Sequence, residues 1–203
     1  MMPSVKPLEG REGMRVGQDL VVAGYIGLGG TIAVAKAEET ELLKHFTRQF
    51  VKRVQGMSDQ IQMPSAEFFK EAGAMEYEPL GDGGIMASLW NLFEEYKMGF
   101  EIELRSIPIL QETVEICEVF DLNPYRLQSA QSVLLTADHG GDLVRYLNQH
   151  GVHGVVIGKV EAGIKRQILN GEIRSFLDRP KPDELYKIKL TGGSDERENF
   201  SSY

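Results

Sequence analysis

The chain has few of the residues that build covalent crosslinks or metal centres. Cys117 is the only cysteine among its 203 residues, which excludes an intrachain disulfide and a cysteine-rich metal site. The four histidines are scattered, and His150 and His153, which lie close in sequence, have no cysteine or acidic ligand beside them. We therefore expect no metal site that this chain builds by itself.

Long apolar runs are also absent. No stretch approaches the roughly 20 apolar residues of a membrane-spanning helix, and residues 1–20 lack the apolar core of a secretory signal. We therefore expect no association with a membrane, and a cytoplasmic location is the simplest expectation.

Positive charge is scarce relative to negative charge. Lysine and arginine number 22 against 30 aspartates and glutamates, which gives a formal net charge of −8. A nucleic-acid-binding surface needs clustered cations to contact the phosphate backbone, whereas Lys159, Lys165 and Arg166 have acids among them. The composition therefore argues against a nucleic-acid partner.

What the chain does contain is the composition of an ordinary globular protein, with 42% hydrophobic and 26% charged residues. Its length is sufficient for a sizeable core. Composition divides the chain into a polar N-terminal segment over residues 1–18, a folded domain over residues 19–190 and a flexible, charged tail over residues 191–203.

Hydrophobic periodicity predicts strands that alternate with helices. Strands are expected at residues 20–23, 31–37, 100–105, 132–137 and 155–160, and helices at residues 38–53, 65–72, 85–97 and 143–149 and after Pro108. Asn170-Gly171 predicts a hairpin turn. In the helix after Pro108, Val114 and Cys117 should face the core, so Cys117 is expected to be a packing residue rather than a nucleophile. The alternation places the fold in the mixed α/β or α+β class.

The segment Gly81-Asp82-Gly83-Gly84 stands directly before the helix expected at residues 85–97. A helix N-terminus has unpaired N–H groups and the positive end of the helix dipole, and glycine lets an anion approach the backbone. Asp82 has two further interpretations, because it could cap the helix or hold a metal ion bound to the phosphate. The spacing alone leaves open whether these residues bind a ligand or only shape a tight loop. Trp90, on the same helix, is expected to be a core or interface residue.

A second loop of the same form, Asp138-His139-Gly140-Gly141, precedes the helix expected at residues 143–149. Its acids would repel an anion, and Asp142 is most simply the helix cap. His139 could titrate near neutral pH, but a single loop histidine is usually only solvated. The loop residues Asp138, His139, Gly140 and Gly141 are therefore secondary candidates for a ligand site.

Gly27, Gly29 and Gly30 invite a comparison with the dinucleotide-binding fingerprint, because they follow an apolar strand. The fingerprint needs glycine or alanine where this chain has Ile32, and the region around Thr47 offers no acid for a ribose. No helix is expected to start cleanly after these glycines. A dinucleotide site is therefore a weak interpretation.

Six segments, taken in order, resemble the C-terminal domain of the AIR synthase-like superfamily. They are Asp82-Gly-Gly-Ile, Gly99-Phe-Glu-Ile-Glu, Ile107-Pro-Ile109, Thr113-Val-Glu-Ile-Cys-Glu-Val-Phe-Asp-Leu-Asn-Pro124, Ser132-Val-Leu-Leu and Gly151-Val-His-Gly-Val-Val-Ile-Gly-Lys-Val160. The resemblance spans roughly residues 18–180 and is strongest to the hydrogenase maturation branch and its AIR synthase-related relatives. It implies an α+β domain in which helices cover a mixed β-sheet.

By this resemblance, Asp82, Gly83 and Gly84 match a loop that lines a phosphate or substrate pocket and faces the ATP site of a partner domain. Gly27, Gly29 and Gly30 correspond to the entry into the domain's first strand. The family's N-terminal domain, which binds ATP and magnesium, has no expected counterpart in residues 1–18. The chain also ends at Tyr203 without the reactive cysteine of the maturation factor. Catalysis of the family kind is therefore not expected of this chain by itself.

The sequence leaves three functions open. The leading one is a stand-alone C-terminal domain that binds a phosphate-bearing small molecule or completes the ATP site of a partner chain, with ATP or phosphate and Mg²⁺ shared between them. The second is a subunit of an ATP-dependent synthetase or dehydratase that is active only with a partner. The third is a homo-oligomeric assembly protein in which Trp90 contributes to the interface. A domain without its usual neighbour would expose apolar surface, so we expect a homodimer or a separate ATP-binding chain as partner.

Overall fold

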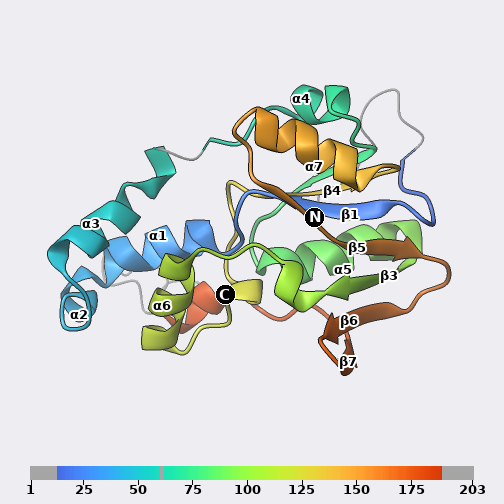
Figure 1. Ribbon diagram of the computed structural model, residues 1–203. Helices are drawn as coiled ribbons and strands as arrows, with labels where there is room; N and C mark the ends of the chain where they lie inside the picture. Colours follow the sequence, from blue (N-terminus) through green and yellow to red (C-terminus); the bar gives the residue numbers. More distant parts are fainter. Residues whose placement is uncertain (1–12, 60–61, 189–203) are drawn as a thin grey trace, which may run out of the picture.

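The computed structural model describes residues 13–59 and 62–188, which form a mixed seven-stranded sheet with helices on both faces (Figure 1). The strands are β1 (Asp19–Ala23), β2 (Glu76–Pro79), β3 (Gly99–Glu103), β4 (Val133–Ala137), β5 (Gly154–Glu161), β6 (Arg166–Asn170) and β7 (Ile173–Phe176). Their order across the sheet is β2-β4-β1-β5-β3-β6-β7. Strands β3 and β6 run parallel, and the other neighbouring pairs are antiparallel. The expected α+β class with a mixed sheet is confirmed.

Helix α5 (Gly84–Tyr96) covers one face of the sheet because its apolar stripe matches the apolar face of the central strands. Leu89 and Phe93 of this helix are fully buried and pack with Phe100 and Ile102 of β3 in the same core cluster. The rings of Phe93 and Phe100 meet edge to face, with centroids 4.7 Å apart. Burial of the stripe therefore fixes the start of α5, and with it the preceding glycine loop, against the sheet.

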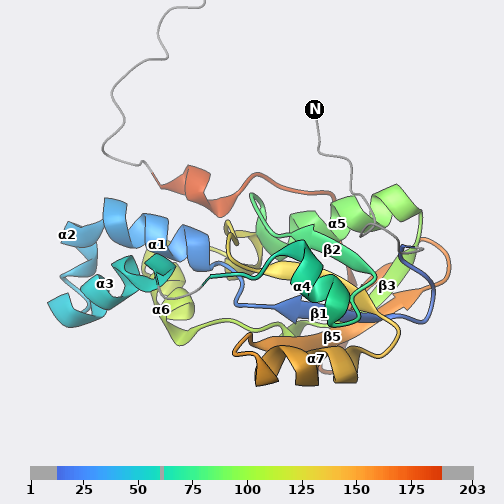
Figure 2. The same cartoon turned by 90° about the horizontal axis from the view of Figure 1, so that it is seen from above.

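Helices α4 (Ala66–Glu71) and α7 (Gly140–Gln149) cover the opposite face, so that α5 and α7 lie on opposite sides of the sheet (Figure 2). Val21 and Leu135 from the sheet pack against Phe69 of α4 and against Leu143 and Leu147 of α7. Strand β4 is buried along its whole length because it lies between these two helical layers.

A lobe of helices lies at one end of the sheet (Figure 1). It contains α1 (Leu28–Ala37), α2 (Glu39–Leu42), α3 (Arg48–Gln55) and α6 (Gln111–Phe120). Its core includes Val34, Leu42, Val51 and Ile116. The described residues also form four short 3₁₀ helices, η1 (Met57–Asp59), η2 (Leu104–Ser106), η3 (Pro124–Arg126) and η4 (Glu184–Lys187). None of the helices within the described ranges is long and apolar enough to cross a bilayer.

Two of the expected elements differ from the structure. Residues 31–37, expected as a strand, belong to helix α1, because Gly27 takes the left-handed conformation with φ 70° and the following alanine-rich segment favours a helix. The helix expected over residues 38–53 is divided into α2 and α3. The hydroxyl oxygen of Thr47 accepts a hydrogen bond from the Phe50 N–H at 3.2 Å and starts α3 as a new helix.

The turn between β6 and β7 and the buried face of α6 were also predicted from the sequence. The hairpin is confirmed, since Asn170 pairs with Ile173 and Gly171 has φ 63° in the turn between β6 and β7. Cys117 is buried, as expected, whereas Val114 is 39% exposed. Val114 lies one position away from the buried i, i+3, i+4 stripe of α6 and therefore faces outward. Of the proposed terminal segments, residues 1–12 and 191–203 lie outside the described residues.

Candidate functional site

The glycine loop, residues 81–84, connects the end of β2 to the start of α5. Gly83 is the N-cap residue of α5 with φ 76°, and Gly84 follows with φ 61°, so both take a backbone conformation that favours glycine. The cap has no side-chain hydrogen bond, so Asp82 is not the helix cap that one interpretation of the sequence suggested. The Asp82 side chain is exposed, which leaves its carboxylate available to solvent.

The N–H group of Gly83 already has an anionic acceptor. Asp183, from the segment after β7, accepts this hydrogen bond through its Oδ2 atom at 2.6 Å. The other carboxylate oxygen of Asp183 accepts from the Leu185 N–H at 2.8 Å, and the residue is only 6% exposed. The helix N-terminus therefore binds a carboxylate supplied by the chain itself.

Gly84 is tightly packed against the chain's own backbone, whereas Gly81 is surrounded by open space. A Cβ atom on Gly84 would lie 2.6 Å from the carbonyl oxygen of Tyr125 and 2.7 Å from that of Leu127. Glycine is thus required at position 84 by the approach of the chain's own backbone. A Cβ atom on Gly81 would meet nothing within 4 Å, so the outer side of the loop is open. The loop is therefore accessible from the side of Gly81 and Asp82.

The second candidate loop lies at the other end of β4, because Pro79 pairs with Val133 whereas Ala137 directly precedes Asp138. The structure therefore does not bring the two loops together. Hydrogen bonds from Gln18 and Arg15 lower the pKa of the Asp138 carboxyl. These contacts anchor the loop to the residues before β1.

Asp142 does not cap α7, in contrast to the expectation. Its carboxylate instead pairs with Arg145 at 2.9 Å. The N–H of Gly140 donates to Oδ2 of Asp19 at 2.9 Å, and a Cβ atom at this glycine would come within 2.5 Å of the Asp19 Cβ. His139 is the N-cap residue of α7 without a side-chain capping hydrogen bond. A carboxylate from a distant segment thus satisfies this helix N-terminus too.

The third glycine segment begins α1 rather than leading into the first strand, which corrects the expectation from the resemblance. Gly27 donates its N–H to the Ser129 hydroxyl at 2.8 Å, and a Cβ atom on Gly30 would lie 2.4 Å from the Leu127 side chain. A helix does follow these glycines, contrary to expectation. However, β1 pairs antiparallel with both β4 and β5, so the parallel βαβ unit of a dinucleotide site is not present around it.

Two glutamates of β2 were missed by sequence reasoning. Glu76 is fully buried, one of its oxygens accepts a hydrogen bond from the Tyr96 hydroxyl, and burial raises its pKa. Burial and the neighbouring Glu76 raise the pKa of Glu78 to about 7. The signal in the sequence is Glu76-Tyr77-Glu78, in which both acids fall on one face of a strand.

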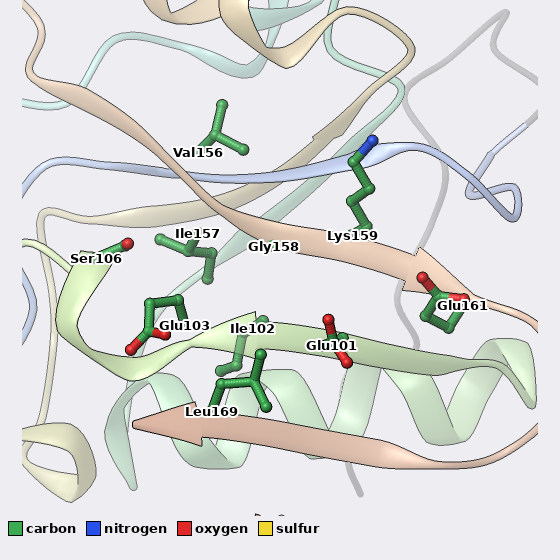
Figure 3. A pocket seen from close by; sticks show the side chains of 10 residues that line it. All are labelled: Glu101, Ile102, Glu103, Ser106, Val156, Ile157, Gly158, Lys159, Glu161 and Leu169. Atoms are coloured by element: carbon green, nitrogen blue, oxygen red, sulfur yellow. The ribbon is translucent and has the colours of Figure 1, made fainter. Parts of the chain in front are cut away.

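A shallow cavity of about 350 Å³ lies between β3, β5 and the end of β6 (Figure 3). Two of its three acidic residues are already engaged, since Glu101 accepts from Gln167 at 2.5 Å and Glu103 from the Arg105 N–H at 3.3 Å. Across the described parts of the chain, no group of three or more His, Cys, Asp or Glu residues is arranged to hold a metal ion. The described lining of the cavity therefore gives no support for a metal site.

The fold is an α+β domain in which helices cover a mixed sheet and a glycine loop precedes helix α5. The model of one family in this class, the C-terminal domain of AIR synthase related proteins, matches residues 15–168. The chain therefore belongs to this family. A search of curated protein sequences gave no match.

Solved structures of enzymes and maturation proteins share the fold. HypE from E. coli, a hydrogenase maturation protein, matches with a TM-score of 0.63 at 15% identity, over 86% of this chain and 53% of that chain. A HypE structure in complex with ATP gives a TM-score of 0.59 at 12% identity, over 82% and 52%. Thiamine monophosphate kinase from Aquifex aeolicus gives 0.55 at 20% identity, over 81% and 54%. The chain thus spans about half the length of these proteins.

Proposed function

We propose that this domain binds a phosphate-bearing small molecule at the glycine loop, or completes the ATP site of a partner chain there. The observation that carries this proposal is the hydrogen bond from the Gly83 N–H to a carboxylate oxygen at 2.6 Å. A loop that holds one oxyanion in this position has the geometry and the electrostatic field to hold another.

The residues of the loop have distinct roles in this proposal. The Gly83 N–H would donate to a phosphate oxygen in place of Asp183. Gly81, with open space around it, would allow the ligand to approach. The exposed carboxylate of Asp82 is a suitable oxygen ligand for a Mg²⁺ ion that accompanies the phosphate. Displacement of Asp183 has an energetic cost, so phosphate binding by the isolated chain should be weak.

A partner fits this proposal because the chain corresponds to about half of each similar protein. One of these proteins is described in complex with ATP, another, AaThiL, with AMPPCP and TMP, and a HypE structure is a HypE–HypF complex. We propose that an ATP-binding domain, on a separate chain or on a second copy in a homodimer, meets the glycine loop. Under this proposal, catalysis requires both parts.

A thermal-shift screen tests the proposal. The purified chain is heated with ATP, ADP, AMP, phosphate or pyrophosphate, each with and without Mg²⁺. A ligand present at about 100 times its dissociation constant should stabilise the fold by about 2.7 kcal/mol. The expected result is a Mg²⁺-dependent shift that the Asp82→Ala substitution removes. An equal shift in wild type and Asp82→Ala would place the ligand elsewhere.

An assembly function has separate support from the exposed edge of the sheet. Strand β7 is an edge strand with all four residues exposed, and Ile173 and Phe176 are 66% and 60% exposed. Such an edge can pair with a strand of another chain. Sedimentation at micromolar concentration tests this function: a dimer that an Arg174→Pro substitution dissociates supports it, and a monomer contradicts it.

A further inference from the structure

A second groove lies between the C-terminal half of α5 and the strands β6 and β7. It has a volume of about 500 Å³ and is lined by Trp90 and Glu94 of α5 together with Lys165, Arg166 and Arg179. This volume is in the range of small-molecule sites. The glycine loop precedes the start of α5, so the two sites are separated by about half of a helix about 20 Å long. The groove is therefore distinct from the ligand site proposed at the glycine loop.

Arg166 makes two contacts in the wall of this groove. Its guanidinium lies 3.9 Å from the centroid of the Trp90 ring, and its Nη2 atom is 2.5 Å from a carboxylate oxygen of Glu94. Its side chain is only 10% exposed, and its buried Nε has no hydrogen-bond acceptor within the described residues. A buried cation with an unmet donor is costly unless an acceptor is supplied. Arg166 shares Glu94 with Lys97, so a bound anion nearby would offset the positive charge that remains.

The charge of the groove is opposite to that of the whole chain. Four cations line it, whereas Glu94 is its only acid, and the chain has a net charge of −8. Glu94 is shared by two of these cations, because Lys97 lies 2.6 Å from one of its oxygens and Arg166 contacts the other. Within the described residues, neither Lys165 nor Arg179 has an ion-pair partner. These two cations are therefore available to an anionic ligand.

Apolar surface lies next to these cations. Ile164 and Phe176 line the groove and are 74% and 60% exposed, and Trp90 forms part of its wall. Exposed apolar side chains that form a contiguous patch are typical of a binding site. An aromatic ring could pack here while an attached oxyanion reaches the cations.

We propose that this groove binds a small organic anion in which an aromatic ring is attached to a phosphate or carboxylate group. The apolar residues contact the ring, Lys165 and Arg179 contact the anionic group, and Arg166 contributes a fixed positive charge. A ring alone would contact only the apolar residues, and an anionic group alone would contact only the cations. The affinity should therefore require the ring and the charge together.

The test uses Trp90 as its reporter, because it is the only tryptophan in the chain. The full chain is titrated with phenyl phosphate while Trp90 fluorescence is recorded, with inorganic phosphate and benzyl alcohol as ligands that have only one of the two features. We expect a saturable change with phenyl phosphate and affinities at least tenfold weaker for the other two. Equal affinity for inorganic phosphate, or no saturable change with phenyl phosphate, would overturn the proposal.

Matched variants locate the ligand. A Lys165→Gln, Arg179→Gln double variant should bind phenyl phosphate at least tenfold more weakly, because two charge-assisted contacts are lost. Lys36→Gln, which removes an exposed cation in α1, should bind as wild type does, and Asp82→Ala reports any binding at the glycine loop. Both lysines and Arg179 are exposed, so these variants should keep the fold. Unchanged affinity in the double variant contradicts the proposal, whereas weakened affinity in Asp82→Ala would assign the ligand to the glycine loop.

Discussion

Asp183 and Gly83 are 100 positions apart in sequence, and the Asp183 carboxylate accepts the hydrogen bond that the Gly83 N–H donates. The segment that carries Asp183 is anchored on both sides, since Leu177 packs in the core beneath α5 and Leu185 packs against the helical lobe. The C-terminal part of the described chain therefore determines whether the glycine loop is open to another anion.

The Asp183→Asn substitution should reduce stability and increase phosphate binding. An asparagine has one acceptor oxygen where the carboxylate uses two, for the N–H groups of Gly83 and Leu185. The loss of a buried, charge-assisted hydrogen bond should lower the free energy of unfolding by about 1–3 kcal/mol. Urea denaturation measures this change. Calorimetric titration with inorganic phosphate should show tighter binding in the variant.

Asp178→Asn is the matched control, because Asp178 is an exposed aspartate in the same segment. It should change the free energy of unfolding by no more than about 0.5 kcal/mol. Equal stability of Asp183→Asn and Asp178→Asn would mean that the contact to Gly83 contributes nothing to the fold.

A pair of glycine substitutions tests why the loop contains glycine. Gly84→Ala should destabilise the fold by at least about 2 kcal/mol, because position 84 has φ 61° and its Cβ would clash with the carbonyl oxygens of Tyr125 and Leu127. Gly81→Ala has open space around the new methyl group and should be almost neutral. Thermal denaturation compares the two. A neutral Gly84→Ala would show that the loop can shift away from η3.

Local patterns predicted much of the fold, but not the contacts that close the site. The stripe of Leu89 and Phe93 identified α5 because burial of one helical face leaves a 3.6-residue period in the sequence. Residues 31–37 were misassigned because Ile32 and Val34 alternate as they would in a strand, whereas Gly27 and tertiary packing determine a helix.

Only the part of the site that is contiguous in sequence could be predicted. The glycines before α5 were identified as a loop that can receive an anion, but Asp183 could not be assigned to it. Nothing in a sequence links two residues that are 100 positions apart and meet only when β7 and the following segment fold back. The same reason explains why Asp19, rather than Asp142, contacts the N-terminus of α7.

The stability of the protein should fall as the pH rises from about 5 to 7. The pKa of Glu78 is raised from an ordinary 4.5 to about 7 and that of Glu76 is also raised, so the folded state binds more protons than the unfolded state in this range. Since Glu78 is only part-buried, solvent screening limits its effect to at most about 2 kcal/mol. Denaturation midpoints across this pH range measure the fall.

Glu78→Gln should flatten this pH dependence, because glutamine stays neutral. Glu118→Gln, which changes an exposed glutamate of α6, should leave the slope as in wild type. A slope that is the same in all three proteins would exclude Glu78 as its source.

Cys117 should not react with thiol reagents in the folded protein. The side chain is buried in the helical lobe, and burial, together with the charge of Glu184, raises the pKa of the thiol to about 12. Iodoacetamide at pH 8 should therefore label less than a tenth of the native chain and nearly all of the urea-unfolded chain, as measured by mass spectrometry. Rapid labelling of the native chain would show that the lobe opens readily.

Amide NMR of the ¹⁵N-labelled chain tests the central claim most directly, because it observes the Gly83 N–H itself. The chain is titrated with Mg²⁺ and pyrophosphate, and the same titration is repeated with Asp82→Ala and Asp183→Asn. Binding at the glycine loop predicts saturable shifts of the Gly81 and Gly83 amide resonances, weaker binding in Asp82→Ala and tighter binding in Asp183→Asn. Resonances of the loop that stay fixed in all three proteins would contradict a phosphate site at this helix N-terminus.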